Sequence, residues 1–201
     1  MTRCASGFAM KTCADQRLPL RIRKAREEDV PEILRLDRAL IRHDRRFDPT
    51  LDPRWSSRPA GRAFFRDRIR GADGAVWVAE VDGKLVGYLA GGCCEAEDYR
   101  RVPPMAEVDC MFVQKHYRGY GIGERLLRRF LACCARCGVG RVRVVACVGN
   151  SGAIAFYRRL GFEPYDLVLE RELSAARRRA RTPSTAKRAP QQRQRKPEGV
   201  E

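Results

Sequence analysis

The dipeptide Asp82-Gly83 constrains the fold most strongly, because it separates two runs of alternating apolar residues by only two positions. These runs cover residues 75–81 and 84–90. Asp-Gly between two alternating runs is a preferred sequence for the type I′ turn, which joins neighbouring antiparallel strands. We therefore expect a β-hairpin near the middle of the chain.

Periodic patterns on both sides of the hairpin predict further elements. Alternating or continuous apolar runs predict strands over residues 20–24, 106–113, 142–148 and 165–173. Apolar residues at helical spacing predict helices over residues 30–41, 64–69, 122–134 and 151–160. The resulting order is β-α-α-β-β-β-α-β-α-β. A hairpin combined with β-α-β units predicts an α/β (α+β) fold, in which helices cover a mixed sheet.

Composition divides the 201 residues into one domain and two extensions. Residues 1–18 show no period and are expected to form a disordered leader, with Met10 as an alternative translation start. Residues 19–173 are enough for one globular domain. Residues 174–201 contain nine Lys or Arg and two Glu, a net charge of +7, and are expected to form a disordered basic tail.

The preceding 173 residues carry the other +9 of the net charge of +16. A basic surface attracts the phosphates of a nucleotide cofactor or of nucleic acid, but does not distinguish between them. Charge alone therefore leaves both kinds of partner open.

Cysteine usage and hydropathy predict a cytoplasmic protein without membrane association. The nine cysteines are an odd, scattered set that fits no disulfide framework. No run approaches the ~20 apolar residues that span a bilayer, and the first 16 residues lack an apolar run of signal-peptide length. The single Cys-x-x-Cys, Cys134 to Cys137, lies in an apolar helical pattern without a second pair, so no metal site is expected.

A glycine-rich turn follows the strand predicted over residues 106–113. It comprises residues 118–123, Arg-Gly-Tyr-Gly-Ile-Gly, and leads into the next helix. Glycines let the backbone approach a ligand closely, and the free amides of a first helical turn favour a phosphate. Arg118 would add a charge-assisted contact. The alternative is that the glycines form only a tight turn. The sequence also lacks the Gly-Lys-Ser/Thr of a P-loop and the ribose-binding acid of a dinucleotide fold.

Two ordered segments resemble the GNAT superfamily of N-acetyltransferases. Residues 108–113 followed by 116–127 look like the coenzyme A motif of this superfamily. Residues 150–162 are similar to its Asn-x-x-Ala-x-x-x-Tyr-x-x-x-Gly-Phe segment. The resemblance covers roughly residues 18–173. It implies a mostly antiparallel sheet whose two central strands splay apart, here ending near Val113 and beginning near Arg141, and it implies acetyl-CoA as cosubstrate.

The resemblance also implies a set of cofactor contacts. The pantetheine arm would lie in the splay, hydrogen-bonded to backbone groups of Met111 and Val113, with an amide near Phe112 or Val113 facing the thioester oxygen. The pyrophosphate would lie on the glycine-rich turn. Asn150 either caps the following helix, binds the pantetheine amide, or does both. The implied cofactor-binding residues are Met111, Phe112, Val113, Arg118, Gly119, Tyr120, Gly121, Ile122, Gly123, Glu124, Arg125 and Asn150.

Two carboxylates are candidates for the base that acetyl transfer requires. Glu107 and Asp109 both interrupt an apolar strand and, by alternation, point to the same face. Glu107 lies six residues before Val113, and the resemblance implies a general base at this position, so Glu107 is favoured. The alternative is that either carboxylate simply pairs with an arginine.

Tyr157 is the candidate general acid. It matches the family tyrosine that faces the coenzyme sulfur, and a phenol with a pKa of ~10 can donate a proton to a departing thiolate. The alternative is a packing role in the core. An acetyl-cysteine route through Cys110 is disfavoured, because strand alternation predicts that Cys110 faces away from Asp109 and Met111, and because the family normally transfers the acetyl group directly.

The amine acceptor is not specified by any motif. The resemblance implies that residues 43–58 and 159–166 select it. Asp44, Asp48 and Asp52 could attract a cation, but neighbouring arginines largely cancel their field, which favours a peptide, a protein or a small mono-amine over a polycation. A second hypothesis is a nucleic-acid-binding or ribosome-binding protein that uses its basic tail, with catalysis lost or secondary. Both a monomer and a homodimer are compatible with the sequence.

Overall fold

The computed structural model describes residues 19–171. The chain divides into two compact units between Glu163 and Pro164. All helices and strands of the described residues belong to the first unit. The leader predicted over residues 1–18, the basic tail predicted over 174–201 and the last two residues of the predicted domain lie outside the described residues.

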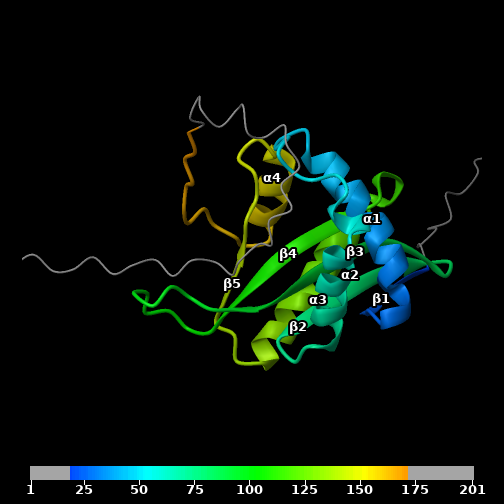
Figure 1. The fold of residues 1–201 in the computed structure, drawn as a ribbon. Helices are drawn as coiled ribbons and strands as arrows, with labels where there is room; N and C mark the ends of the chain where they lie inside the picture. Colours follow the sequence, from blue (N-terminus) through cyan, green and yellow to red (C-terminus); the bar gives the residue numbers. More distant parts are fainter. Residues whose placement is uncertain (1–18, 172–201) are drawn as a thin grey trace, which may run out of the picture. The chain divides into compact units, whose positions relative to one another are not determined.

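The first unit contains a five-stranded sheet in which the spatial order of the strands follows the sequence, β1-β2-β3-β4-β5 (Figure 1). Strands β1 to β4 pair in antiparallel fashion, and β4 and β5 pair in parallel. The sheet is therefore mixed and mostly antiparallel, as predicted. The strands are β1 (Leu20–Lys24), β2 (Gly74–Val81), β3 (Lys84–Cys94), β4 (Met105–Val113) and β5 (Arg141–Val144).

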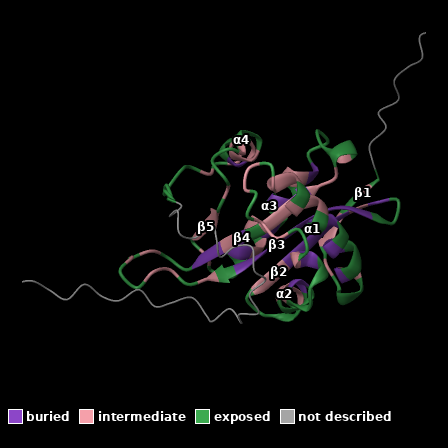
Figure 2. Ribbon diagram, turned by 45° about the horizontal axis from the view of Figure 1, so that its top comes forward, coloured by how far each residue is buried: buried purple, intermediate pink, exposed green. Residues whose placement is uncertain are grey.

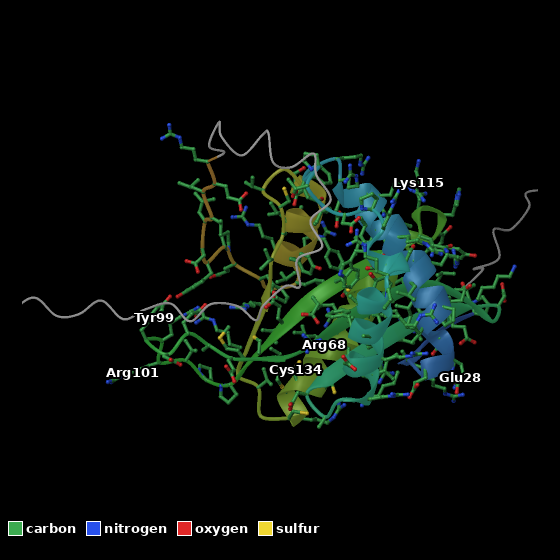
Figure 3. The ribbon with its side chains drawn as sticks, in the orientation of Figure 1. Glu28, Arg68, Tyr99, Arg101, Lys115 and Cys134 are labelled. Atoms are coloured by element: carbon green, nitrogen blue, oxygen red, sulfur yellow. The ribbon has the colours of Figure 1, made fainter. Side chains whose placement is uncertain are left out.

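The hairpin predicted at Asp82-Gly83 joins β2 to β3. Asp82 has a φ of 49° and Gly83 a φ of 73°, the two positive values that a type I′ turn requires. The next connection, residues 95–104 between β3 and β4, extends away from the helices with Tyr99 and Arg101 at its tip (Figure 3).

Helices cover both faces of the sheet (Figure 1). The first and second α-helices along the chain pack on one face of the sheet. The third packs on the other face, together with Tyr157 of the fourth. The helices are α1 (Val30–Asp44), α2 (Pro59–Arg70), α3 (Ile122–Arg136) and α4 (Ser151–Arg159), with short 3-10 helices at Glu27–Asp29, Trp55–Ser57 and Lys115–Tyr117.

Alternation along the central strands produces two separate hydrophobic cores. In β2, Val76 and Val78 pack with α1 and α2, while Trp77 and Ala79 pack with α3. Figure 2 shows the buried residues concentrated in the central strands and on the inner sides of the helices. Burial on both faces fixes the sheet as a rigid support for the residues that extend from its strand ends.

A β-bulge interrupts the pairing of β3 with β4. Ala90 pairs with Cys110, but the next residue, Gly91, pairs with Val108, so Asp109 is an extra residue on β4. The bulge shifts the alternation by one residue. Cys110 consequently packs against the core under α1 and α2 and lines one cavity with Asp109. The expectation that Cys110 faces away from Asp109 was wrong, because simple alternation holds only where no bulge occurs.

Strand β5 is shorter than predicted. It ends at Val144, whereas the alternating pattern predicted a strand to residue 148, and Val145 and Val148 are exposed. Its pairing with β4 therefore stops at Val108 and Val144. Beyond that point β4 continues for five residues without β5 beside it, so the two central strands diverge as expected.

The final strand predicted over residues 165–173 is not formed in its described part. Residues 164–171 belong to the second unit and have no regular secondary structure. The apolar side chains Tyr165, Leu167, Val168 and Leu169 are all exposed. A period of two indicates a strand only where a partner strand supplies hydrogen bonds, and local sequence does not encode that partner.

No helix within residues 19–171 has the combination of length and apolar character that a membrane span needs.

Candidate active site

The divergence of β4 and β5 opens a cavity of about 520 Å³, which we call the splay cavity. It lies at the end of the sheet where β5 no longer pairs with β4, so no strand beside β4 separates the two faces of the sheet there. Its walls therefore come from both faces. Leu40 and Asp44 of α1 lie on one side, Ile122 of α3 and Tyr157 of α4 lie on the other, and Met111, Phe112 and Val113 of β4 lie between them.

The backbone of β4 presents hydrogen-bonding groups toward this cavity. Gln114 N donates to Val86 O at 2.9 Å, so the backbone groups of Gln114 and, by alternation, of Phe112 face β3. The backbone groups of Met111 and Val113 face the opposite way, toward the side that β5 has left. An extended amide-containing chain could continue the sheet there, as the pantetheine arm was expected to do.

The glycine-rich turn places free amides at the start of α3. Gly119 and Gly121 have φ values of 87° and 71°, in the left-handed region that glycine adopts without strain. The first α-helical hydrogen bond runs from Arg125 N to Gly121 O, so the amides of residues 122–124 precede it. Residues 121–124 line the splay cavity. An anion in this part of the cavity would meet both these amides and the positive end of the helix dipole.

Arg118 is fixed beside this turn. Its Nε donates to Val113 O at 2.9 Å, and its guanidinium lies 5.4 Å from the ring centroid of Phe112. Arg118 and Gly119 line the cavity, whereas Tyr120 and Arg125 do not, and Tyr120 is 60% exposed. The structure thus gathers ten of the twelve predicted cofactor-binding residues around one space. Those ten are Met111, Phe112, Val113, Arg118, Gly119, Gly121, Ile122, Gly123, Glu124 and Asn150.

Helix α4 brings Asn150 and Tyr157 to the same cavity. The Asn150 side chain accepts a hydrogen bond from Ala153 N at 3.1 Å, so it caps α4, which was one of its two expected roles. Tyr157 lies two turns further along and is 9% exposed. Its ring packs edge-on against Phe156 and Phe162, at centroid distances of 5.2 and 5.5 Å.

The environment of Tyr157 keeps its phenol protonated. Burial raises the pKa of Tyr157 well above its ordinary value, and the nearby Cys110 and Asp44 add to the shift. Within residues 19–171 no hydrogen bond engages the phenol oxygen. Packing and acid function do not exclude each other here, because the ring fills the core while the residue also lines the cavity.

Glu107 and Asp109 line a second cavity of about 470 Å³, which we call the acidic cavity. Each carboxylate has an arginine partner. Arg143 Nε lies 2.9 Å from Glu107 Oε2, and Arg68 of α2, labelled in Figure 3, lies 2.8 Å from Asp109 Oδ2 through its Nε. Burial raises the pKa of Asp109, although Arg68 opposes this shift. Pairing with an arginine, which was the alternative to a catalytic role, therefore occurs at both positions.

Cys110 is poorly suited to nucleophilic catalysis. Burial raises the pKa of its thiol well above the usual value, so the thiolate is disfavoured at neutral pH. This agrees with the expectation of transfer without an acetyl-cysteine, although the reason differs from the one drawn from strand alternation.

Two aspartates of α1 contribute to the cavities. Asp37 is 3% exposed and accepts hydrogen bonds of 2.5 Å from Ser56 Oγ and from the Tyr88 hydroxyl. Asp44 lines both the splay cavity and the acidic cavity. Asp37 was overlooked in the sequence, and Asp44 was considered only as part of a loop. Both fall on the apolar stripe of α1, seven residues apart. A carboxylate at a position expected to face the core can be recognised in the sequence and indicates a candidate functional residue.

The described residues contain no group of three or more His, Cys, Asp or Glu side chains arranged to hold a metal ion.

Comparisons with known proteins agree with the fold and with the two segments that resembled acetyltransferase motifs, the glycine-rich turn and α4. A family model described as Acetyltransferase (GNAT) domain matches residues 72–164. These residues include the hairpin, the glycine-rich turn and α4. Over residues 72–164 the chain is therefore similar to the GNAT acetyltransferase domain.

Two curated relatives carry acetyltransferase names. An uncharacterized N-acetyltransferase of Methanocaldococcus jannaschii is 30% identical over 147 residues, which are 73% of this chain and 62% of that protein. An N-alpha-acetyltransferase of Sulfurisphaera tokodaii is 29% identical over 148 residues, or 71% of this chain and 80% of that protein. The match thus spans less than two thirds of the first relative's length.

A solved structure of an aminoglycoside N-acetyltransferase in complex with CoA has the same fold. Its TM-score is 0.62 with 15% identity, and the match covers 80% of this chain and 98% of that chain. At this identity the likeness concerns the fold and carries no information about the acceptor.

Proposed function

We propose that this protein is an N-acetyltransferase that transfers the acetyl group of acetyl-CoA directly to an amine. The observation that carries the proposal is the splay cavity. In one space it combines the open backbone edge of β4, the free amides at the start of α3 and the Tyr157 side chain. These features suit, in turn, an amide-bearing arm, a pyrophosphate and a departing thiolate.

The residues that would hold acetyl-CoA follow from this arrangement. Backbone groups of Met111 and Val113 would bind the pantetheine arm, and the amides of residues 122–124 with Arg118 would bind the pyrophosphate. When bound, acetyl-CoA supplies a thioester carbonyl as the electrophile. Of the two amides expected near the thioester oxygen, that of Phe112 faces β3, so the amide of Val113 would polarise this oxygen.

The proposed reaction is a single transfer in a ternary complex. The amine nitrogen attacks the thioester carbon, so a C–N bond forms as the C–S bond breaks. The amine must lose a proton, and we assign Glu107 as the base that takes it, directly or through water. The leaving thiolate gains a proton from Tyr157, whose raised pKa keeps that proton in place until the sulfur departs.

Binding and turnover test this proposal separately. Acetyl-CoA should raise the melting temperature of the full chain, because a ligand that binds only the folded state stabilises it. Incubation with a panel of amines and peptide N-termini should then release free coenzyme A thiol. A folded protein, checked by circular dichroism, that shows no thermal shift at millimolar acetyl-CoA would contradict the proposal.

The name of the Sulfurisphaera tokodaii relative supports a peptide N-terminus as the acceptor, and a small mono-amine stays a prediction from the sequence. The cytoplasmic location, the contact of the basic tail with nucleic acid and the choice between monomer and homodimer stay predictions from the sequence.

A further inference from the structure

The acidic cavity adjoins the splay cavity through α1. Leu40 and Asp44 line both spaces. A molecule in the acidic cavity would therefore meet the splay cavity at Asp44, which lies near enough to Tyr157 to influence its ionisation. The arrangement brings an acceptor and the proposed acetyl donor together at one point.

The charges of the acidic cavity are mostly compensated. Its lining includes five carboxylates and no lysine or arginine. Three of the five form ion pairs with arginines outside the lining, namely Asp52 with Arg58, Asp109 with Arg68 and Glu107 with Arg143.

The two remaining carboxylates differ in accessibility. Asp37 is buried and held by Ser56 and Tyr88, both neutral donors. Asp44 is a third exposed and, within residues 19–171, has no Lys or Arg partner; its contact is His43 Nδ1, 3.1 Å from Oδ1. His43 adds a full positive charge only when its ring is protonated.

The position of Asp44 in α1 is locally unfavourable. It is the last residue of the helix, where the negative end of the helix dipole disfavours a carboxylate. Residues that break a local rule of stability are expected at functional sites. The Asp44 carboxylate is partly exposed at the junction and has no Lys or Arg partner within residues 19–171, and this placement has a reason if the carboxylate binds a cation.

The other walls of the acidic cavity are apolar. They are formed by Leu40, Ile41, Leu51, Trp55 and Phe64. Trp55 and Phe64 contact each other edge to face, with their ring centroids 5.6 Å apart. Such a wall suits an aliphatic or aromatic group and offers nothing to the hydroxyls or additional ammonium groups of a polar polycation.

We propose that the acidic cavity is the acceptor site, that Asp44 binds the acceptor amine, and that the acceptor is a singly charged primary amine next to an apolar or aromatic group. This inference rests on the proposed acetyltransferase function. The ammonium first gives one proton to the base, and the neutral amine that remains has two N–H groups. One of them donates to Asp44 while the nitrogen attacks. The other N–H proton is lost as the C–N bond forms, and it replaces the proton that Tyr157 gives to the departing thiolate.

The acceptor chemistry can come from two sources, and a panel distinguishes them. One arm contains short peptides that begin with Leu or Phe, and the other contains phenethylamine. Peptides beginning with Asp or Lys test the apolar wall, and spermidine tests the preference against a polycation. We expect coenzyme A release to be fastest with one of the two apolar arms. It should be slow with the peptides that begin with Asp or Lys and with spermidine. Spermidine as the best acceptor, or no release with either apolar arm from protein that binds acetyl-CoA, would overturn the assignment.

Two variants test Asp44 and one tests the wall. Asp44→Asn should raise the KM for the best amine by roughly 10- to 100-fold, the size of one charge-assisted hydrogen bond, while the thermal shift with acetyl-CoA is unchanged. The control is Asp48→Asn. Asp48 is a partly exposed aspartate four residues away that accepts hydrogen bonds from Thr50 and lines neither cavity, so its substitution should leave KM unchanged. Trp55→Ala should reduce the preference for Phe over Asp at the first peptide position.

The outcomes separate this inference from the proposed function. If acetyl-CoA gives a thermal shift and amines release coenzyme A, but Asp44→Asn has the wild-type KM, the acceptor assignment is wrong and the acetyltransferase function stands. If wild-type protein shows neither thermal shift nor coenzyme A release, the proposed function fails and this inference fails with it.

Discussion

Glu107 and Arg143 are direct neighbours on the parallel strands β4 and β5, and their side chains form an ion pair with 2.9 Å between Oε2 and Nε. The pair lies at the last part of the sheet where these strands are still hydrogen-bonded. Arg143 contacts Oε2, so we expect Oε1 to be the oxygen that takes the proton of the acceptor amine.

Glu107→Gln should lower turnover by about 10² near neutral pH, because the side-chain shape is kept and the basicity is lost. Part of the loss should return as the pH rises, since more of the amine is then already deprotonated. A rate series on one confirmed amine, from mildly acidic to mildly alkaline pH, measures both effects.

Asp109→Asn is the matched control for this variant. Asp109 lines the same cavity on the same strand and also pairs with an arginine, Arg68. Its effect on turnover should be smaller. If Asp109→Asn were the crippled enzyme and Glu107→Gln worked normally, the base would be Asp109, the residue that the bulge inserts into β4.

Gly121→Glu should weaken acetyl-CoA binding by at least about tenfold, because it places a carboxylate beside the amides proposed to bind phosphate. The change also costs stability, since Gly121 has a φ of 71°. Gly138 provides the control at the other end of α3. It has a φ of 75°, and at both glycines a Cβ atom would meet nothing within 4 Å.

Gly138→Glu should therefore cost a similar amount of stability, about 1 kcal/mol, and leave acetyl-CoA affinity unchanged. Urea unfolding and equilibrium binding on both variants give the comparison. Equal affinity in the two folded variants would show that the glycine-rich turn is only structural.

Much of this fold could be predicted because its signals are local. Asp82-Gly83 specifies its turn through the backbone preferences of two residues, and the helix after Gly121 follows from apolar periodicity in a single segment. The order of elements up to α4 was obtained in this way. The cofactor side of the candidate site is likewise one continuous stretch of chain, from β4 through the glycine-rich turn.

The features that were missed depend on distant partners. The bulge at Asp109 forms opposite Gly91, where a Cβ atom would lie 2.4 Å from Glu107 O and 2.7 Å from the Phe130 ring. Its location thus depends on β3 and α3 as well as on β4. The missing strand after α4 and the early end of β5 have the same explanation, since a strand exists only where another accepts it.

Asp29→Asn should lower the free energy of unfolding by about 1–2 kcal/mol at pH 7. The Asp29 side chain is 13% exposed, and its oxygens accept hydrogen bonds of 2.7 and 2.9 Å from Arg23. Arg23 holds the pKa of Asp29 below its usual value. Its stabilisation is therefore present above the unfolded-state pKa of ~3.9 and is lost as the pH falls through the lower folded-state pKa.

Urea unfolding of wild type and Asp29→Asn across acidic pH tests this sign. The difference between them should shrink as the pH falls below ~3.9. Glu28→Gln is the control, because Glu28 is exposed in the 3-10 helix Glu27–Asp29 that precedes α1 (Figure 3) and should change stability little. A difference between wild type and Asp29→Asn that stays constant with pH would mean that the ionised pair is not its source.

Tyr157→Phe should lower turnover several-fold to about tenfold while leaving acetyl-CoA affinity nearly unchanged, because loss of a general acid affects the transition state and not the bound ground state. The loss is limited, since water can partly replace a phenol.

Burial raises the pKa of Tyr157 well above the ordinary value of ~10, so the phenol keeps its proton, and its effect on rate, through the alkaline range up to at least pH ~10. Below that pH, ionisation of Tyr157 should therefore cause no decline in the wild-type rate. The pH profiles of wild type and Tyr157→Phe should show no difference that such a decline would produce. Tyr99→Phe makes the same chemical change on the exposed β3–β4 loop and should have the wild-type rate. Equal turnover of Tyr157→Phe and wild type at every pH would leave Tyr157 with a packing role alone and assign the proton of the departing thiolate to water.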